Sequence, residues 1–401
     1  MVPVLEKLSK FLALEGNIRV LAVQTVLSQV GYGMFLVVWQ PYILSTGATL
    51  AQLGLVQTVI NITTGISLIL WGYISDHYGR KPVIVATLLC RVAAILSLMA
   101  SSSLWALLAY GALMGFTAMF YIGNPARNAL ITESVEAAQR GTAMSTLITI
   151  SQGISTLVAT LGGYIAFKLG YTPIFILMVI GDTLGSLLCY KYLKETLVDP
   201  KNPGETPVMQ RLRNSLAPEP QLIRLYTALL LLGFSYTVAY SLLYGALSKS
   251  FGFTTVQLGV LSTSFNLLWA LGSIPLGKLV DRIGRKRGLL MSLTMALATS
   301  LGFLFSRGFR WFAFFNALSA LDVGFWIPSY TSYITETVEH DKRSTVFGKL
   351  DAYSKATAIP GAWVAGVLYE RYGFHAPLYI QIAVVLVVIV LMLGLKDPAH
   401  S

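Results

Sequence analysis

Charged residues are scarce in this sequence of 401 residues, because Asp, Glu, Lys and Arg together make up 12% of it while 55% is hydrophobic. Soluble domains carry about 25% charged residues, so a soluble enzyme does not fit this composition. A mean hydropathy of +0.67 also excludes a disordered chain. We therefore expect hydrocarbon, not water, to surround most of the chain.

Cysteine and histidine are rare as well. The two cysteines, Cys90 and Cys189, lie inside apolar runs, which predicts small buried side chains and excludes a disulfide scaffold. An H-E-x-x-H pattern is absent, which argues against an intramembrane metalloenzyme. The four histidines are expected at loops or termini: His77, His340, His375 and His400. We therefore predict that the protein is not an enzyme and that it holds no metal or cofactor.

Long apolar runs are abundant, and each is close to the roughly 20 residues that a membrane-spanning helix needs. We count twelve, separated by charged or turn-forming residues. The first six are Ile18–Pro41, Ala51–Ser75, Pro82–Ser101, Leu104–Ala126, Gly141–Phe167 and Thr172–Leu193. The second six are Arg224–Ser248, Thr254–Val280, Gly288–Ser306, Phe309–Ser332, Arg343–Tyr369 and His375–Leu395.

The basic residues predict the orientation of these spans. Of the 29 Lys and Arg residues, 22 fall in segments on one side of the membrane, five fall on the other side, and Arg91 and Lys355 fall within spans. Lys and Arg near span ends are retained in the cytoplasm, so we expect a protein of the cell membrane with both termini in the cytoplasm. The basic residues form no stripe with interleaved aromatics, so the net charge of +11 does not indicate nucleic acid as a partner.

The predicted spans divide the chain into two bundles of six. Residues 1–193 form the first bundle together with a short amphipathic segment, Met1–Asn17, and residues 224–401 form the second. The polar, proline-rich stretch 194–223 is predicted to be a cytoplasmic linker, with a short helix around Met209–Leu216. We expect an all-α membrane protein that is a monomer in the lipid bilayer.

The second half of the sequence repeats the first. Gln52-Leu53-Gly54 recurs as Gln257-Leu258-Gly259 at an offset of 205 residues. Further along, Gly163 and Gly170 recur as Gly366 and Gly373 at an offset of 203. Six spans is an even number, so both copies enter the membrane in the same orientation, as parallel repeats related by a pseudo-two-fold axis along the membrane normal. Transporters commonly have this architecture.

One motif between spans two and three is present in both halves. It comprises Gly72, Asp76, Gly79, Arg80 and Lys81 in the first half and Gly277, Asp281, Gly284, Arg285 and Lys286 in the second. The pattern G-x-x-x-D-x-x-G-R-K, found twice between the corresponding spans, resembles that of the major facilitator superfamily. The resemblance also covers E-x6-R, matched by Glu133 with Arg140 and by Glu336 with Arg343.

The resemblance implies that these motifs form a gate on the cytoplasmic side. Asp76 is expected to face the N-terminus of span eleven near Ser344, whose free N–H groups and positive dipole attract a carboxylate. Asp281 is expected to face span five near Thr142 in the same way. The alternative is that Arg80 and Lys81 merely follow the charge rule for cytoplasmic loops, which leaves the matched aspartates unexplained.

Two pairs of charged residues lie at depth within the spans, where charge is costly and indicates function or a partner. Arg91 and Asp182 lie about 14 Å and about 16 Å from the cytoplasmic ends of spans three and six, at 1.5 Å per residue. We interpret them as a structural ion pair. Asp322 and Lys355 in spans ten and eleven are the candidate coupling pair, with Asp322 as the proton-binding carboxylate. The alternative is a permanent ion pair that only joins two helices.

Polar and aromatic side chains in spans one, seven and ten predict an amphipathic substrate cavity. Tyr236, Tyr240 and Tyr244 follow at intervals of four residues on one face of a helix. The cavity candidates are completed by Gln24, Gln29, Tyr32 and Trp326. Such an aromatic stripe can equally be ordinary packing.

The family resemblance implies secondary active transport by alternating access. We expect proton-coupled export of a small lipophilic or organic solute, with the substrate and H⁺ as partners. Proton-coupled import of a small organic solute is the alternative within transport. A non-transporting receptor or scaffold on the same fold is the alternative outside it, because fold does not determine function.

Overall fold

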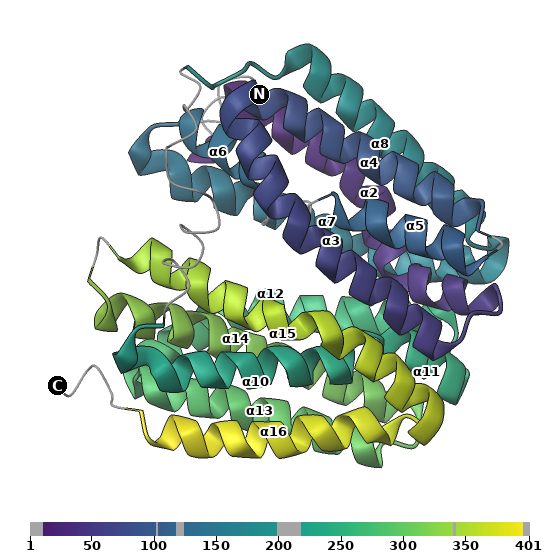
Figure 1. Cartoon of the computed structure of the whole chain (residues 1–401), viewed down its shortest axis with the longest axis vertical. Coiled ribbons are helices and arrows are strands. Elements are labelled where there is room, and N and C mark those ends of the chain that lie inside the picture. The colour runs from purple at the N-terminus through teal and green to yellow at the C-terminus, as the bar shows by residue number, and fades with distance from the viewer. Residues whose placement is uncertain (1–10, 102, 118–123, 199–217, 340–341, 396–401) are drawn as a thin grey trace. The chain divides into compact units, whose positions relative to one another are not determined.

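A computed structural model describes residues 11–101, 103–117, 124–198, 218–339 and 342–395. All of the regular secondary structure in these ranges is helical (Figure 1). The predicted helix at Met209–Leu216 and most of the predicted amphipathic segment Met1–Asn17 lie outside the described residues. A helix satisfies its own backbone hydrogen-bonding groups. Helices are therefore expected in a bilayer, which offers no hydrogen bonds.

The helices of the first half lie at the six predicted positions. They are α2 (Gly16–Ser45), α3 (Leu50–Tyr78), α4 (Arg80–Met99), α5 (Leu104–Gly115), α6 (Pro125–Glu133), η1 (Ala137–Gln139), α7 (Arg140–Leu169) and α8 (Thr172–Tyr192). Helices α2, α3 and α7 are longer than predicted, because helical structure continues past the apolar core into flanking residues.

The helices of the second half also lie at their predicted positions. They are η2 (Pro220–Leu222), α10 (Ile223–Tyr240), α11 (Leu243–Phe251), α12 (Thr255–Ile283), α13 (Arg285–Phe305), α14 (Phe309–Thr337), α15 (Arg343–Tyr372) and α16 (His375–Leu393). Among the described segments, nine are long and apolar enough to cross a membrane. Helices α14 and α15 are not among the nine, although both are long enough to cross a membrane.

Spans four and seven are not the continuous helices that the sequence predicts. In the predicted span Leu104–Ala126, α5 ends at Gly115, and α6 begins at Pro125. The side chain of its N-cap, Asn124, accepts a hydrogen bond from the Arg127 N–H. Asn before Pro is a helix-start signal that hydropathy does not register. Span seven breaks after Tyr240, and α11 begins at Leu243.

Matched glycines adopt the same backbone conformation in both halves. Gly79 and Gly284, which separate the second and third helices of each half, have φ of 108° and 94°. Gly170 and Gly373 have φ of 79° and 82°. A residue with a Cβ is disfavoured at these angles, so glycine allows the tight connections between consecutive helices. The sequence repeat is therefore also a repeat of local structure.

The fold consists of two compact units. Each unit includes the start of one helix from the other half of the chain. The first contains the described parts of Met1–Ala48 and Val59–Gly204 together with Thr254–Gly259, the start of α12. The second contains Thr49–Thr58, the start of α3, and the described parts of Glu205–Phe253 and Val260–Ser401.

Glycine allows the starts of α12 and α3 to pack closely within these units. A Cβ on Gly259 would lie 2.7 Å from the Ala159 carbonyl oxygen on α7, and a Cβ on Gly54 would lie 2.6 Å from the Ala362 carbonyl oxygen on α15. The start of each of these two helices also makes a hydrogen bond at the same contact. At the start of α12, Thr255 Oγ1 donates to the Gly163 carbonyl at 2.6 Å. The Leu50 N–H donates to Glu370 at 2.9 Å.

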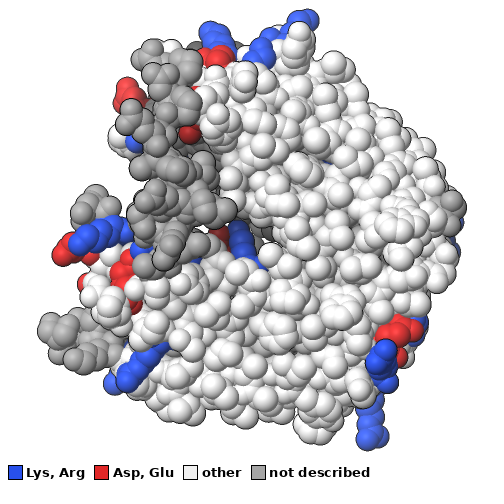
Figure 2. Space-filling model, in the orientation of Figure 1, with Lys and Arg blue, Asp and Glu red and all other residues white. Residues whose placement is uncertain are grey.

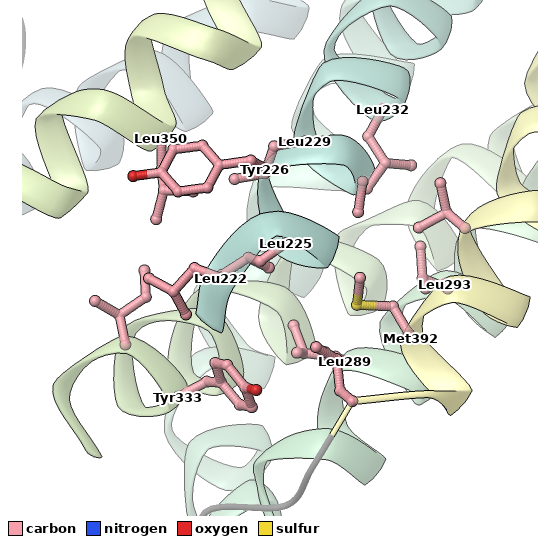
Figure 3. Packing of buried hydrophobic residues seen from close by; sticks show 14 of the residues in the cluster. Leu222, Leu225, Tyr226, Leu229, Leu232, Leu289, Leu293, Tyr333, Leu350 and Met392 are labelled. Atoms are coloured by element: carbon pink, nitrogen blue, oxygen red, sulfur yellow. The ribbon is translucent and has the colours of Figure 1, made fainter. Parts of the chain in front are cut away.

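Each unit has its own apolar core. In the first, α2, α4, α6, α7 and α8 bury residues such as Leu21, Leu88 and Leu130. In the second, α10, α13, α14, α15 and α16 surround a cluster that includes Leu225 and Met392 (Figure 3). Such burial contributes about 25 cal/mol per Å² relative to water, but far less relative to lipid, so close packing is the larger part of helix association here.

The outer surface is that of a membrane protein. Charged side chains gather toward helix ends, and broad stretches between them carry almost no charge (Figure 2). Large apolar side chains are exposed there, among them Leu157 at 79%, Val390 at 69% and Trp105 at 80%. Water would penalise such a surface, whereas lipid tails solvate it.

Candidate functional site

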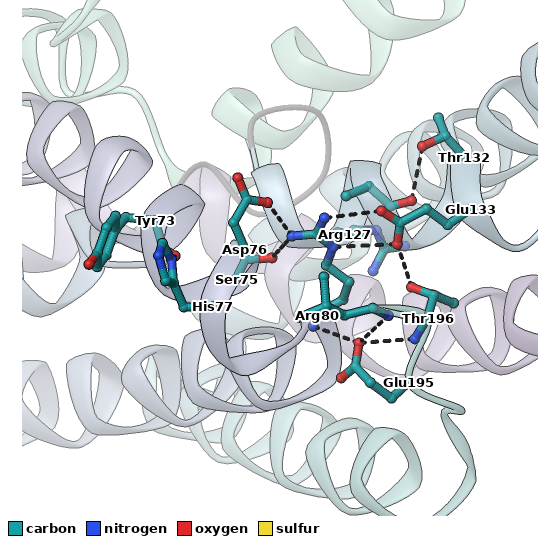
Figure 4. Close-up of polar contacts among 12 residues, drawn as sticks. Tyr73, Ser75, Asp76, His77, Arg80, Arg127, Thr132, Glu133, Glu195 and Thr196 are labelled. Atoms are coloured by element: carbon teal, nitrogen blue, oxygen red, sulfur yellow. Dashed lines mark hydrogen bonds and ion pairs between the residues drawn. The ribbon is translucent and has the colours of Figure 1, made fainter. Parts of the chain in front are cut away.

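The first copy of the repeated motif forms a network of charges within its own unit. Arg80 Nη1 lies 2.5 Å from Asp76 Oδ1, and Arg80 Nη2 lies 3.0 Å from Glu133 Oε1 (Figure 4). The Arg80 side chain is 7% exposed, whereas those of Asp76 and Glu133 are about one-third exposed. A buried guanidinium therefore connects the end of α3 to the end of α6.

The segment after α8 closes this network. The Glu195 carboxylate accepts the backbone N–H groups of Arg80 and Lys81 at 2.8 and 3.0 Å, at the N-terminus of α4. Thr196 donates to Glu133 at 2.5 Å (Figure 4). Burial acts to raise the pKa of Glu195, but the hydrogen bonds from four backbone N–H groups outweigh it and leave the pKa below its ordinary value. The ionised carboxylate is thus the form that holds the N-terminus of α4.

The second copy of the motif repeats the arrangement. Arg285 lies 3.0 Å from Asp281 and 2.9 Å from Glu336. Here Asp281 is 68% exposed, so this copy is more open to solvent. Lys286 differs from Lys81, because its ammonium donates to the Leu393 carbonyl at 2.7 Å, whereas the ammonium of Lys81 lies over the ring of Tyr190.

The basic residues of the E-x6-R pattern bind carbonyls and not the glutamates of the pattern. Arg140 donates to the Thr132 carbonyl at 3.0 Å. Arg343, its counterpart, donates to the Thr335 carbonyl at 2.5 Å and to the Val338 carbonyl at 3.1 Å. Glu133 and Glu336 pair instead with Arg80 and Arg285 of the repeated motif. The two motifs thus form one connected set of contacts in each unit.

The glycines at the start of the motif have no comparable contact. A Cβ on Gly72 would lie 3.9 Å from the side chain of Pro125, and a Cβ on Gly277 would meet nothing within 4 Å. Neither position requires glycine for space within its unit.

Arg91 and Asp182 meet in the first unit, between α4 and α8. Arg91 Nε donates to Asp182 Oδ2 at 2.7 Å, and Arg91 Nη2 binds the other carboxylate oxygen. Both side chains are 0% exposed. The Tyr32 ring lies 4.8 Å from the guanidinium carbon and adds a cation–π contact. This two-point ion pair with an aromatic face is fully buried, which is consistent with the interpretation as a structural pair.

The candidate cavity residues of span one are held by neighbouring helices. Gln24 is fully buried, accepts a hydrogen bond from Arg127 at 2.7 Å and donates to Ser28 at 2.9 Å. Gln29 donates to Ser155 on α7. These bonds join α2 to α6 and α7. The structure therefore places Gln24 and Gln29 in the packing of the first unit.

A cavity of about 220 Å³ in the second unit contains Asp322. Its wall is formed by apolar residues, by Tyr236 and Trp326, and by Ser354. Asp322 is 7% exposed and accepts hydrogen bonds from the hydroxyls of Tyr236 and Ser292. The described residues that line the cavity include no lysine or arginine. A buried carboxylate thus faces an apolar cavity with neutral donors on it.

The predicted contact between Asp322 and Lys355 is wrong. Lys355 Nζ lies 2.8 Å from Asp351 Oδ2, one turn earlier on α15, and both side chains are more than half exposed. Matching depths along two helices do not establish which faces of those helices point at each other. A local partner at i−4 is always within reach on a helix.

The three tyrosines of span seven do not form one continuous face. Tyr236 binds Asp322, and its ring lies 5.6 Å from that of Tyr240. Tyr240 hydrogen-bonds Ser300 on α13 at 2.7 Å. Tyr244 lies beyond the helix break, on α11, and bonds to Ser262 on α12. Of the predicted cavity residues, Tyr236 and Trp326 line the cavity with Asp322.

Several residues of these sites were not singled out from the sequence. Ser292 and Ser354 are ordinary small polar residues of membrane helices, and no pattern marks them. Arg127 is only 3% exposed, although the charge rule counts it with the loops. Glu195 lies two residues beyond Leu193, and no sequence pattern links it to the N-terminus of α4, which only the fold brings next to it.

The sequence matches the model of the Major Facilitator Superfamily over residues 21–247 and 225–401. The chain belongs to the major facilitator superfamily. It is therefore a multi-pass membrane transporter and not an enzyme.

Two curated relatives of this superfamily member carry the same name, "Multidrug resistance protein MdtG". The protein of Dickeya zeae (strain Ech586) is 24% identical over 340 residues, which is 83% of this chain and 82% of the relative. The protein of Salmonella typhi is 22% identical over 335 residues, with the same coverage.

Solved superfamily structures share the fold at low identity. The nucleoside transporter NupG has a TM-score of 0.76 at 13% identity and covers 95% of this chain and 98% of its own. A bacterial homologue of the iron transporter ferroportin, in an inward-facing state, has a TM-score of 0.73 at 15% identity, covering 94% and 97%. The human organic anion transporter MFSD10 (TETRAN) has a TM-score of 0.65 at 16%, covering 94% and 98%.

The buried pair predicts an asymmetric response to substitution. Arg91→Met leaves a buried carboxylate without its cation, so the free energy of unfolding should fall by about 3–5 kcal/mol. The double variant Arg91→Met/Asp182→Leu should recover most of that loss, measured by thermal unfolding in detergent. Lys355→Met breaks an exposed pair and should change stability by about 1 kcal/mol or less. A double variant no more stable than the single one would contradict a structural pair.

Proposed function

We propose that this transporter couples proton movement to the export of a small lipophilic or organic solute. The observation that carries the proposal is Asp322, a buried carboxylate in an apolar cavity that accepts hydrogen bonds from Tyr236 and Ser292. Export is supported by the name that the curated relatives carry, "Multidrug resistance protein MdtG".

The surroundings of Asp322 favour a change in its charge during transport. An ionised carboxylate in an apolar environment is costly unless a cation or a proton neutralises it. Two hydroxyl donors offset only part of that cost. Either a proton or a cationic group of the solute can therefore occupy the site with a gain in free energy, and a site that favours one at a time couples the two.

The cavity wall supports a lipophilic solute. Trp326 and Tyr236 present aromatic surface, and Leu229, Leu232 and Leu293 complete an apolar lining. The Trp326 ring stacks on Tyr330 at 5.8 Å, which holds it in one orientation. A rigid aromatic wall with one polar anchor suits a flat organic molecule better than a sugar, which needs many hydrogen bonds.

We propose further that the repeated motif is a gate on the cytoplasmic side, where both termini lie. The contacts within each unit position Asp76 and Asp281 at the ends of α3 and α12. In the outward-open state, Asp76 would face the N-terminus of α15 and Asp281 that of α7, where helix dipoles favour a carboxylate. Twelve spans in two bundles related by a pseudo-two-fold axis, acting as a monomer, complete this proposal.

The coupling role of Asp322 can be tested by substitution. In proteoliposomes, Asp322→Asn should abolish uptake driven by a pH gradient and should retain downhill exchange of the solute. The matched control is Asp351→Asn, which removes an exposed carboxylate on α15 and should leave both activities intact. Proton-driven uptake at the wild-type rate in Asp322→Asn would refute the coupling role. Preserved downhill exchange shows that the variant is folded.

The gate role of Asp76 has a conformational readout. Asp76→Asn should shift the population toward the inward-open state, because the proposed closing contact loses its charge. A cysteine in place of Val323, which lines the cavity, should then react faster with an impermeant maleimide added on the cytoplasmic side. Glu339→Gln is the control, since Glu339 is exposed and pairs with Lys342. Unchanged transport together with unchanged labelling would rule out the gate.

A further inference from the structure

A second cavity of the second unit lies between α13 and α14, at the turn that joins them. It has a volume of about 400 Å³. Its lining includes Ala298, Leu301 and Phe305 from α13 and Trp311 and Phe315 from α14. Phe305 is 75% exposed and Trp311 60% exposed, so the groove opens on the outer surface of the helices. In a membrane protein that surface faces lipid.

Two small residues shape this groove. Gly302 lets α14 approach closely, because an added Cβ there would run into the ring of Phe315. The Ser306 hydroxyl donates to the Gly302 carbonyl at 2.7 Å, which satisfies it within its own helix. On the opposite wall, the rings of Trp311 and Phe315 stack at 6.4 Å with an interplanar angle of 27°. The result is an apolar slot with a flat aromatic side.

Two arginines lie at the turn between the two helices that form the groove. Arg307 and Arg310 fall between the groove residues Ser306 and Trp311, and both are exposed. Neither belongs to any ion pair among the residues that the structure describes. The charge rule predicts this turn on the outer side, where cations are few, and yet it holds two of the five outside Lys and Arg residues. A local anionic partner would explain this departure from the rule.

We propose that the groove binds an anionic phospholipid. One acyl chain lies in the slot between α13 and α14, and the headgroup phosphate lies against Arg307 and Arg310. Apolar walls fit a hydrocarbon chain, and guanidinium groups bind phosphate through charge-assisted hydrogen bonds. Trp311 directly follows Arg310, and tryptophan is enriched at membrane interfaces, where a phospholipid headgroup lies.

Charge complementarity favours a lipid over a second transmembrane helix in this groove. A helix would cover the apolar walls but would leave two unpaired cations at the membrane interface. A zwitterionic lipid offers the phosphate but also a cation that competes with the arginines. An anionic headgroup supplies phosphate with no opposing charge, so the site should distinguish lipids by headgroup charge. The proposal does not depend on the transported solute or on Asp322.

Lipid retention by the purified protein tests the site. The full chain in detergent is exposed to phosphatidylglycerol or to phosphatidylcholine with the same acyl chains, and native mass spectrometry counts the lipids that remain bound. The wild type should retain one phosphatidylglycerol at a detergent concentration that removes phosphatidylcholine. Equal retention of the two lipids would overturn the proposal.

Matched variants locate the site. Ala298→Phe fills the slot and should lose the retained lipid, whereas Val390→Phe adds the same ring at a 69% exposed position on α16 and should keep it. The double variant Arg307→Gln/Arg310→Gln should lose the preference for phosphatidylglycerol. Arg371→Gln, at another exposed arginine predicted on the same side, should retain the preference. If both Ala298→Phe and the double arginine variant retained phosphatidylglycerol as the wild type does, the lipid would bind elsewhere and the proposal would be wrong.

Thermal unfolding tests whether the groove variant and the arginine variants are folded. The arginine variants alter only exposed side chains and should have the melting temperature of the wild type in lipid-free detergent. Added phosphatidylglycerol should then raise the melting temperature of the wild type and of Val390→Phe, and should not raise that of the double arginine variant. An equal rise in all three proteins would overturn the proposal even if Ala298→Phe fails to fold.

Discussion

The hydrocarbon of a bilayer offers no hydrogen bonds, so every backbone group within it must be satisfied by the chain itself. The regular elements of the described chain are accordingly all helices. Helices surrounded by lipid gain little from apolar burial and must associate by close packing and by polar contacts. The glycines that bring α3 against α15 and α12 against α7 meet this requirement. They also tie the start of one helix from each half of the chain into the other unit.

The same constraint makes each intramembrane charge informative. Arg91 and Asp182 bind each other at two points, with no exposed surface and an aromatic ring on the cation. Asp322 is in the opposite situation, because hydroxyl groups hold it beside an open cavity. We interpret the first as a charge pair that stabilises the fold and propose that the second is available to a ligand. Our proposal of a coupling site rests on that contrast.

Much of this fold could be predicted from the sequence, because hydropathy, glycine turns and the internal repeat depend on short stretches of chain. The positions of helices, the matched connections at Gly79 and Gly284, and the depths of Arg91 and Asp182 follow from such local signals. The pairing of side chains on different helices depends on how each helix is rotated about its axis. That rotation cannot be read from a single sequence. Lys355 therefore pairs with Asp351, against the prediction, and Ser292 and Ser354 had no signal at all. The breaks in spans four and seven were missed because both lie inside apolar runs.

The central claim is that the cavity at Asp322 opens alternately to the two sides of the membrane. The most direct measurement uses a cysteine in place of Ser354, which lines the cavity, in a protein whose Cys90 and Cys189 have been replaced. An impermeant maleimide is added to right-side-out or to inverted vesicles, with and without a pH gradient. The account predicts labelling from both sides, with one rate rising as the other falls when the gradient is imposed. Labelling from a single side under every condition would contradict it.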